Sequence, residues 1–206
     1  MTGQLIDNWN ELFEEEEIPQ WEDLEPNVEF CSFLRRYIKP DDGVLELGSG
    51  LGHNAIFLAK SGLKITASDI SSNAVKRVGM IAETQGIKVE TRVLDILNPG
   101  HLDETYRVVF DKGCFHSFFT RESRLAFANA VYDLLPQGGY WISSIGSADN
   151  QDASDDPYAY SYPRLSLEKI ATIVESLFEI VEVRKGHYGH TGDRQFITWE
   201  CAFVKR

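Results

Sequence analysis

The sequence has few cysteines, and they stand far apart. Cys31, Cys114 and Cys201 are the only three among 206 residues. An odd number of widely separated cysteines does not form a disulfide framework, and no His/Cys/Asp spacing is typical of a metal site. We therefore expect reduced thiols, a cytoplasmic location and no metal.

Long apolar runs are also missing. No run approaches the length that spans a membrane, and Met1–Asn10 lacks the basic and apolar regions of a signal peptide. Hydrophobic residues make up 43% and charged residues 25%, as in an ordinary globular protein. We expect one domain over residues 1–206, a monomer or weak homo-oligomer, and no membrane partner.

Basic residues are scarce. Lys and Arg number 20 against 32 Asp and Glu, which gives a net charge of −12. Such a surface repels phosphate backbones, so nucleic acid is not an expected partner. The first 30 residues contain no Lys or Arg, yet they carry Trp9 and Trp21. Residues 1–40 are interpreted as a helical leader that docks onto something apolar or anchors the N-terminus to the core.

The stretch Val44–Lys60 predicts a buried strand, a glycine turn and a helix. The turn holds Gly48, Gly50 and Gly52, and this order opens nucleotide-binding α/β domains. A dinucleotide fingerprint needs a further glycine where this chain has His53, which argues against a dehydrogenase. A plain tight turn remains the alternative.

Two acids stand at the ends of the next two predicted strands. Asp69 follows the strand at 63–68, where a carboxylate can accept both ribose hydroxyl protons, and Ile70 beside it can pack on adenine. Capping of the helix at 73–85 is the competing interpretation of this segment. Asp95 and Ile96 follow the strand at 87–94, and an ordinary loop acid is the alternative there.

A fourth predicted strand, 106–110, leads into Asp111 and His116. Carboxyl ends of parallel strands carry the chemistry of α/β sheets, so both are candidate catalytic residues. Asp111 could orient a cofactor amino group or the substrate, or bind local backbone amides. His116 could be a base or substrate contact, or a histidine hydrogen-bonded to a carbonyl.

These motifs together resemble the class I S-adenosylmethionine-dependent methyltransferases. The residues that carry the resemblance are E-L-G-S-G-L-G at 46–52, D-K-G-C-F-H at 111–116 and L-P-Q-G-G at 135–139. The second of these, with the tryptophan-bearing leader at 9–26, is similar to the thiopurine, thiol and tellurite-type group. The N-P-P motif of nucleobase and glutamine methyltransferases is absent.

The resemblance implies a fold, a cofactor and a class of acceptor. The fold would be α/β and Rossmann-like, with a seven-stranded, mostly parallel sheet, helices on both faces and an antiparallel C-terminal hairpin. Residues 41–206 would form this core, with strands at 178–183 and 196–204, a loop at 186–192 between them, and a lid-like or disordered insertion at 146–163. The cofactor would be S-adenosylmethionine, and the acceptor a small molecule methylated at sulfur or another soft atom.

The resemblance also implies roles for individual residues. Glu46 would reach toward the methionine amine, and Gly48 would let that part of the cofactor lie against backbone. Asp95 would meet the adenine amino group. Trp9, Trp21, Tyr158 and His187 are the expected substrate contacts.

Three other functions stay open from the sequence. The acidic leader could attract basic peptides for methylation of a protein side chain. The chain could also be a regulator that binds the cofactor without turnover, or a dinucleotide dehydrogenase, which His53 and the terminal hairpin disfavour.

The kind of acceptor decides whether the enzyme needs a general base. A thiol titrates near neutrality and needs little help from a base, whereas an alcohol would need a positioned base.

Overall fold

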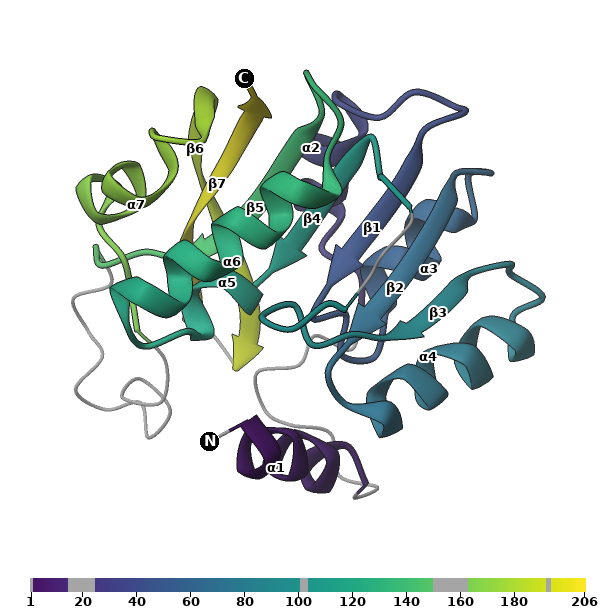
Figure 1. Ribbon diagram of the computed structural model, residues 1–206. Helices are drawn as coiled ribbons and strands as arrows, with labels where there is room; N and C mark the ends of the chain where they lie inside the picture. The colour runs from purple at the N-terminus through teal and green to yellow at the C-terminus, as the bar shows by residue number, and fades with distance from the viewer. Residues whose placement is uncertain (1, 15–24, 101–103, 150–162, 192–193) are drawn as a thin grey trace.

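The computed structural model describes residues 2–14, 25–100, 104–149, 163–191 and 194–206. Helices and strands alternate through most of the chain (Figure 1). In chain order they are α1 (Thr2–Glu14), α2 (Val28–Arg35), β1 (Gly43–Leu47), α3 (His53–Ala59), β2 (Lys64–Asp69), α4 (Ser72–Thr84), β3 (Glu90–Val93), β4 (Val108–Lys112), α5 (Cys114–Ser117), α6 (Arg121–Leu134), β5 (Tyr140–Gly146), α7 (Leu167–Val174), β6 (Phe178–Thr191) and β7 (Arg194–Lys205).

The strands form a seven-stranded sheet in the order β3-β2-β1-β4-β5-β7-β6. The first five are parallel, whereas β7 pairs antiparallel with both β5 and β6. This confirms the predicted mostly parallel α/β sheet with an antiparallel C-terminal hairpin. The strand order reverses between β1 and β4, which is where open α/β sheets bind ligands.

Helices cover both faces of the sheet, as predicted. Alternate strand residues point to opposite faces, so Leu45 and Leu47 pack in one apolar cluster and Val44 in the other. The first cluster includes residues of α6 and α7, and the second includes residues of α2, α3 and α4. In Figure 1, α6 and α7 lie in front of the sheet and α2 and α3 behind it.

Three helices begin at polar residues that cap them. The side chain of Ser71 accepts a hydrogen bond from the backbone of Ala74 at the start of α4. Thr120 and Ser166 cap α6 and α7 in the same manner.

The prediction of a loop at 186–192 is wrong for residues 186–191, which belong to β6. Gly186 pairs with Thr198 and His187 with Ile197, so the two strands continue well beyond residue 183. Gly186 fits here because a Cβ at this position would collide with the carboxylate of Glu200. A glycine that signals a turn in the sequence is therefore needed by strand packing.

Two predicted segments lie partly outside the described residues. The leader is described as α1 and from residue 25 onward, and the insertion at 146–163 only at its ends. The division into leader, core and insertion stays a prediction. No helix in the described part of the chain is long and apolar enough to cross a membrane.

Candidate functional site

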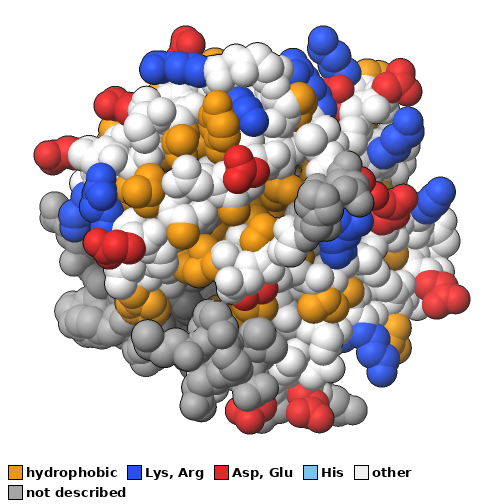
Figure 2. Space-filling model, viewed as in Figure 1, with side chains coloured by type: hydrophobic (Ala, Val, Ile, Leu, Met, Phe, Trp, Pro, Cys, Tyr) orange, Lys and Arg blue, Asp and Glu red, His pale blue; other side chains and the backbone are white. Residues whose placement is uncertain are grey.

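A cavity of about 560 Å³ opens at the carboxyl ends of the parallel strands. This volume lies within the usual range of ligand pockets. On the face that carries α6, hydrophobic side chains gather in the middle and charged ones lie mostly toward the edge (Figure 2). The predicted site residues that line the cavity are Trp9, Glu46, Gly48, Gly50, Asp69, Ile70, Asp95, Ile96 and His116.

The glycine turn follows β1 in left-handed backbone. Gly48, Gly50 and Gly52 have φ values of 65°, 51° and 71°, which non-glycine residues rarely adopt. A Cβ on Gly52 would lie 2.7 Å from Val78, and Gly52 does not line the cavity. A Cβ on Gly48 would lie 2.8 Å from both the Cβ and the Sγ of Cys114. Position 48 therefore requires glycine because Cys114 of the protein lies so close to it, whether or not a ligand also approaches.

Asp69 ties the glycine turn to the end of β2. One carboxylate oxygen accepts a hydrogen bond from the Gly50 amide and the other from the Ser71 amide, both at 2.9 Å. Burial raises the pKa of the Asp69 carboxyl, and these amides oppose that effect. The Ile70 amide also hydrogen-bonds this carboxylate. A carboxylate has about four acceptor positions, so Asp69 can still accept a hydroxyl proton from a ligand in the cavity.

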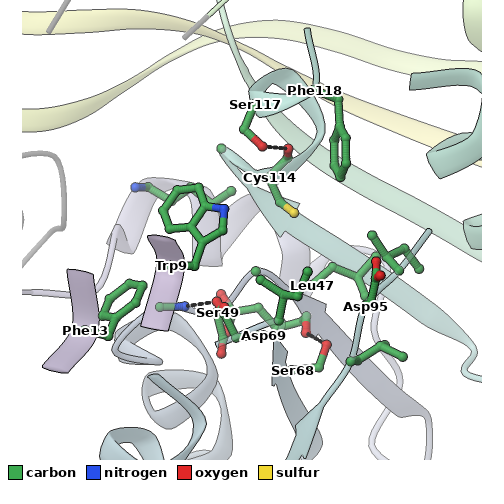
Figure 3. A pocket seen from close by; sticks show the side chains of 18 of the residues that line it. Trp9, Phe13, Leu47, Ser49, Ser68, Asp69, Asp95, Cys114, Ser117 and Phe118 are labelled. Carbon is green, nitrogen blue, oxygen red and sulfur yellow. Dashed lines mark hydrogen bonds between the residues drawn. The ribbon is translucent and has the colours of Figure 1, made fainter. Parts of the chain in front are cut away.

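Asp95 and Ile96 lie at the far side of the cavity from α1. The Asp95 carboxylate accepts hydrogen bonds from the Leu97 amide at 3.0 Å and from Asn98 Nδ2 at 2.8 Å. These contacts fix its turn, and the side chain still borders the cavity. Figure 3 shows Trp9 on one side and Asp95 on the other, with Cys114 between them in this view.

Ser49 is a site residue that the sequence did not indicate. Its hydroxyl is buried, lines the cavity and has no hydrogen-bond partner among the described residues. Buried polar groups are normally satisfied. A polar ligand held at the glycine turn would supply the hydrogen bond that this hydroxyl lacks.

Asp111 was predicted to be a catalytic residue and a cofactor contact, and this role stays a prediction. It is fully buried and is not among the residues that line the cavity. Its oxygens accept hydrogen bonds from Trp141 Nε1 at 3.0 Å and from the Phe115 amide at 2.9 Å. Burial raises the pKa of Asp111 to about 6. Asp111 therefore fixes α5 against β5, which is the structural alternative weighed from the sequence.

His116 lines the cavity with a defined orientation. The Gly146 amide donates to its Nδ1 at 2.7 Å, and only 5% of the residue is exposed. Since Nδ1 accepts, the proton of the neutral ring is assigned to Nε2. Burial, with the positive charges of Lys112, Arg124 and Arg164, lowers the pKa of His116 to about 4. The ring is therefore neutral at pH 7, with Nε2 as a donor.

Helix α1 covers the cavity beside the glycine turn. Asn10 Oδ1 accepts hydrogen bonds from the hydroxyls of Ser71 and Ser72 at 3.0 and 3.2 Å. Phe13 is buried against Leu51 and stacks on Trp9, with 6.5 Å between ring centroids. Helix α1 thus borders the cavity and packs on the core, and the role of the whole leader stays a prediction.

Of the other predicted substrate contacts, His187 is the one that lies among the described residues. His187 is exposed and does not line the cavity, and its carbonyl accepts a hydrogen bond from Asn27 Nδ2 at 2.7 Å. Trp21 and Tyr158 lie outside the described residues. Among the described residues no group of His, Cys, Asp and Glu could hold a metal ion, and the three cysteines are free.

Two aromatic residues that line the cavity, shortly after His116, were not predicted from the sequence. Phe118 and Phe119 line the cavity, and Phe119 remains 67% exposed. Two adjacent aromatic residues after a strand-end histidine, in a stretch that ends a short helix, were the available signal. Lys112 and Cys114 line the cavity as well.

Residues 44–139 match the family described as "Methyltransferase domain". The chain is 29% identical over 133 residues to the eEF1A lysine and N-terminal methyltransferase homolog of Drosophila melanogaster, covering 63% of this chain and 20% of that protein. It is 29% identical over 167 residues to the sarcosine/dimethylglycine N-methyltransferase of Halorhodospira halochloris, covering 78% of this chain and 57% of that protein. The chain thus spans less than two thirds of either curated relative.

The fold also matches solved structures. One, from a study of the conversion of a disulfide bond into a thioacetal group during echinomycin biosynthesis, superposes with a TM-score of 0.82 at 20% identity, covering 100% of this chain and 93% of the other. The N-methyltransferase NodS of Bradyrhizobium japonicum, in complex with S-adenosyl-L-homocysteine, gives a TM-score of 0.71 at 15% identity, with 97% of each chain covered. These similarities support the fold.

Proposed function

We propose that this chain, whose residues 44–139 match a methyltransferase domain, is a class I S-adenosylmethionine-dependent enzyme. It transfers the methyl group of that cofactor to sulfur, or another soft nucleophilic atom, of a small molecule. The cofactor supplies a methyl group already activated by a positively charged sulfur. The protein then has to align a nucleophile, exclude water and, for some acceptors, remove a proton.

The described residues that line the cavity fit this cofactor. Asp69 offers a remaining acceptor position for a ribose hydroxyl, and Ile70 and Ile96 offer apolar surface for a base. Glu46 and Asp95 supply further acceptors, which suit amino groups. The unsatisfied hydroxyl of Ser49 provides an independent sign that a polar ligand belongs beside the glycine turn.

The observation that carries the soft acceptor is the state of His116. Its Nδ1 already accepts the Gly146 amide proton, so Nε2 holds a proton and cannot take another. Asp111 lies outside the cavity with both oxygens engaged. Neither predicted catalytic residue is thus arranged as a general base. A thiol, with an unperturbed pKa of about 8.5, ionises without one far more readily than an alcohol does.

A small acceptor is favoured by the closure of the cavity. Helix α1 lies over it and is fixed by the contacts of Asn10 and Phe13, which leave a space suited to a small ligand. The name of the sarcosine/dimethylglycine relative describes a small acceptor. The echinomycin structure concerns sulfur chemistry. The first name supports the size of the acceptor but not its atom, because an N-methyltransferase acts on nitrogen, and the second supports sulfur.

Calorimetry with S-adenosylhomocysteine tests the cofactor, with NAD as the comparison. We expect binding of the former alone. Asp69→Asn should weaken it about tenfold, because an amide loses an acceptor in a buried hydrogen-bond network, whereas Asp133→Asn, at an exposed position of α6, should leave it unchanged. Labelled S-adenosylmethionine is then supplied with thiols, selenols, tellurite, phenols and amines. Methylation confined to phenols or amines would refute the soft acceptor.

Methylation of a protein side chain is the second candidate function. The eEF1A lysine and N-terminal methyltransferase homolog is the observation in its favour. Lysine-rich peptides offered in the same assay separate the two functions. Methyl transfer to peptides without transfer to thiols would establish the second.

A further inference from the structure

Phe119 is a large apolar side chain left in solvent at the rim of the cavity. It lines the cavity and is 67% exposed, more than any other large hydrophobic residue that the structure describes. A single exposed apolar residue is ordinary on a protein surface. This one borders a cavity of ligand size, next to a second ring, Phe118, that lines the same cavity.

The backbone around Phe119 is held on both sides. Its carbonyl accepts a hydrogen bond from Nη2 of the buried Arg124 at 3.3 Å. The next residue, Thr120, begins α6 with a capping box. The preceding ring, Phe118, packs against Phe127 with 5.4 Å between ring centroids. The exposed ring is therefore carried by an ordered segment, so a ligand that contacts it pays little for ordering the protein.

The start of α6 does not account for the ring of Phe119. The residue stands one position before the cap, where an apolar side chain often packs against the fourth residue of the helix. Here that fourth residue is Arg124, and its guanidinium contacts the backbone carbonyl of Phe119. The usual packing of two apolar side chains at a helix start is therefore absent at this position, whereas a ligand in the cavity would give the ring a contact.

The charged residues that line the cavity belong to other segments. Glu46, Asp69 and Lys112 lie within β1, β2 and β4, and Asp95 follows β3. Asp95 is on the same side as Phe118 in the view of Figure 3, and its carboxylate accepts two hydrogen bonds from its own turn. Residues 118–119 contribute two rings and no charge. Polar parts of the ligands are therefore matched at the strand ends, and an apolar part at residues 118–119.

We propose that Phe119 is a specificity-determining residue, which contacts an apolar part of the methyl acceptor at the rim of the cavity. Phe118 continues this contact within the cavity. The acceptor is then a small molecule with a hydrocarbon body, rather than an inorganic ion or a thiol with a polar body. This inference rests on the proposed function, because it concerns the acceptor of that reaction, and it narrows that acceptor by the part that does not react.

The test compares three thiols that differ in their apolar part. 2-Mercaptoethanol, propanethiol and pentanethiol are titrated by calorimetry into the protein saturated with S-adenosylhomocysteine, so binding is measured without methyl transfer. The first two have nearly the same size, and a methyl group in one replaces a hydroxyl in the other. Burial of one methylene group raises affinity about fourfold. We therefore expect pentanethiol to bind about fourfold or more tightly than propanethiol, and 2-mercaptoethanol to bind weakest.

Variants at Phe119 locate the effect, and its exposure means that they should fold. Phe119→Ser should abolish most of the gain from propanethiol to pentanethiol, and Phe119→Leu should keep most of it. Met80→Ser removes an apolar side chain that is 57% exposed on α4 and does not line the cavity, so the gain should be unchanged. With labelled S-adenosylmethionine, Phe119→Ser should raise KM for pentanethiol and leave kcat unchanged.

Each outcome has one meaning. Equal binding of the three thiols, no binding of pentanethiol, or a gain that Phe119→Ser leaves intact overturns the apolar contact. A lower molecular mass of Phe119→Ser than of the wild type in sedimentation would assign the ring to a contact between copies of the chain, and overturns it as well. Failure of S-adenosylhomocysteine to bind overturns the proposed function instead. A gain that depends on Phe119 in a protein that methylates no thiol supports the apolar contact and rejects sulfur as the acceptor atom.

Discussion

Replacing Gly48 by alanine should destabilise the protein through two separable effects. The residue has a φ of +65°, and left-handed backbone costs an alanine about 1–2 kcal/mol. The new Cβ would also lie 2.8 Å from two atoms of Cys114, and such overpacking costs about 1–3 kcal/mol. Together these lower the free energy of unfolding by about 2–5 kcal/mol.

Gly86 provides a matched control for the backbone effect. Its φ is also +65°, it is exposed, and nothing lies within 4 Å of the position of a Cβ. Gly86→Ala should therefore cost only the backbone term of about 1–2 kcal/mol. Urea denaturation of both variants measures the difference, which we assign to the contact with Cys114. The reasoning is refuted if Gly48→Ala costs no more than Gly86→Ala.

A double-mutant cycle with Cys114→Gly tests the assignment directly. The glycine removes both atoms that the new Cβ would meet, so the double variant should recover about 1–3 kcal/mol relative to the sum of the single changes. Calorimetry with S-adenosylhomocysteine gives a second readout. Gly48→Ala should weaken binding because the glycine turn must shift, whereas Gly86→Ala should not. A coupling energy near zero would mean that the turn moves away from α5 freely.

Three further changes have expected outcomes. Trp9→Ala removes a ring that lines the cavity and stacks on Phe13. The affinity for S-adenosylhomocysteine should therefore fall, and the free energy of unfolding should decrease by about 1 kcal/mol. Glu11→Ala, at an exposed position of α1, is the control. The pKa of His116 is about 4 in the folded protein against an ordinary 6.5, so between these pH values only the unfolded chain binds the proton. The wild type should therefore lose stability as the pH falls, by about 1.4 kcal/mol per pH unit. His116→Asn should not show this loss. The pKa of Asp111 is about 6 in the folded protein against an ordinary 3.8, so between these pH values the folded state binds the proton. The wild type should therefore gain stability relative to Asp111→Asn as the pH falls from 6 to 4. Denaturation between pH 4 and 8 measures the stability of both variants relative to the wild type, and a stability difference that does not change with pH would contradict the prediction.

Most of the parallel sheet and the cofactor end of the cavity could be predicted because both depend on local sequence. A buried apolar run, a glycine turn and an acid at a strand end each leave a signal within a few residues. Asp69 was placed in this manner, and it lines the cavity. Its hydrogen bond to Gly50 joins residues 19 positions apart, so no local pattern contains it.

The features that could not be predicted depend on distant residues. Gly186 suggested a turn, but Glu200 on the neighbouring strand requires a glycine there. The hydrogen bond that Trp141 donates to Asp111 joins residues 30 positions apart, so no local pattern indicates it. Both cases place a polar group in the interior, where its partner determines its role. The sequence carries the residue types but not the pairing.

The contact between Gly48 and Cys114 joins the two ends of the cavity. Gly48 belongs to the turn that borders the cofactor end, and Cys114 begins the short helix α5 that carries His116. The same helix is fixed by Asp111 through the Phe115 amide, and His116 in turn accepts the Gly146 amide at the end of β5. A displacement of the glycine turn must therefore either push α5 or be absorbed by the turn alone. Because α5 is held at both ends by buried hydrogen bonds, the turn is the part that yields, and changes at Gly48 should impair cofactor binding before they displace His116.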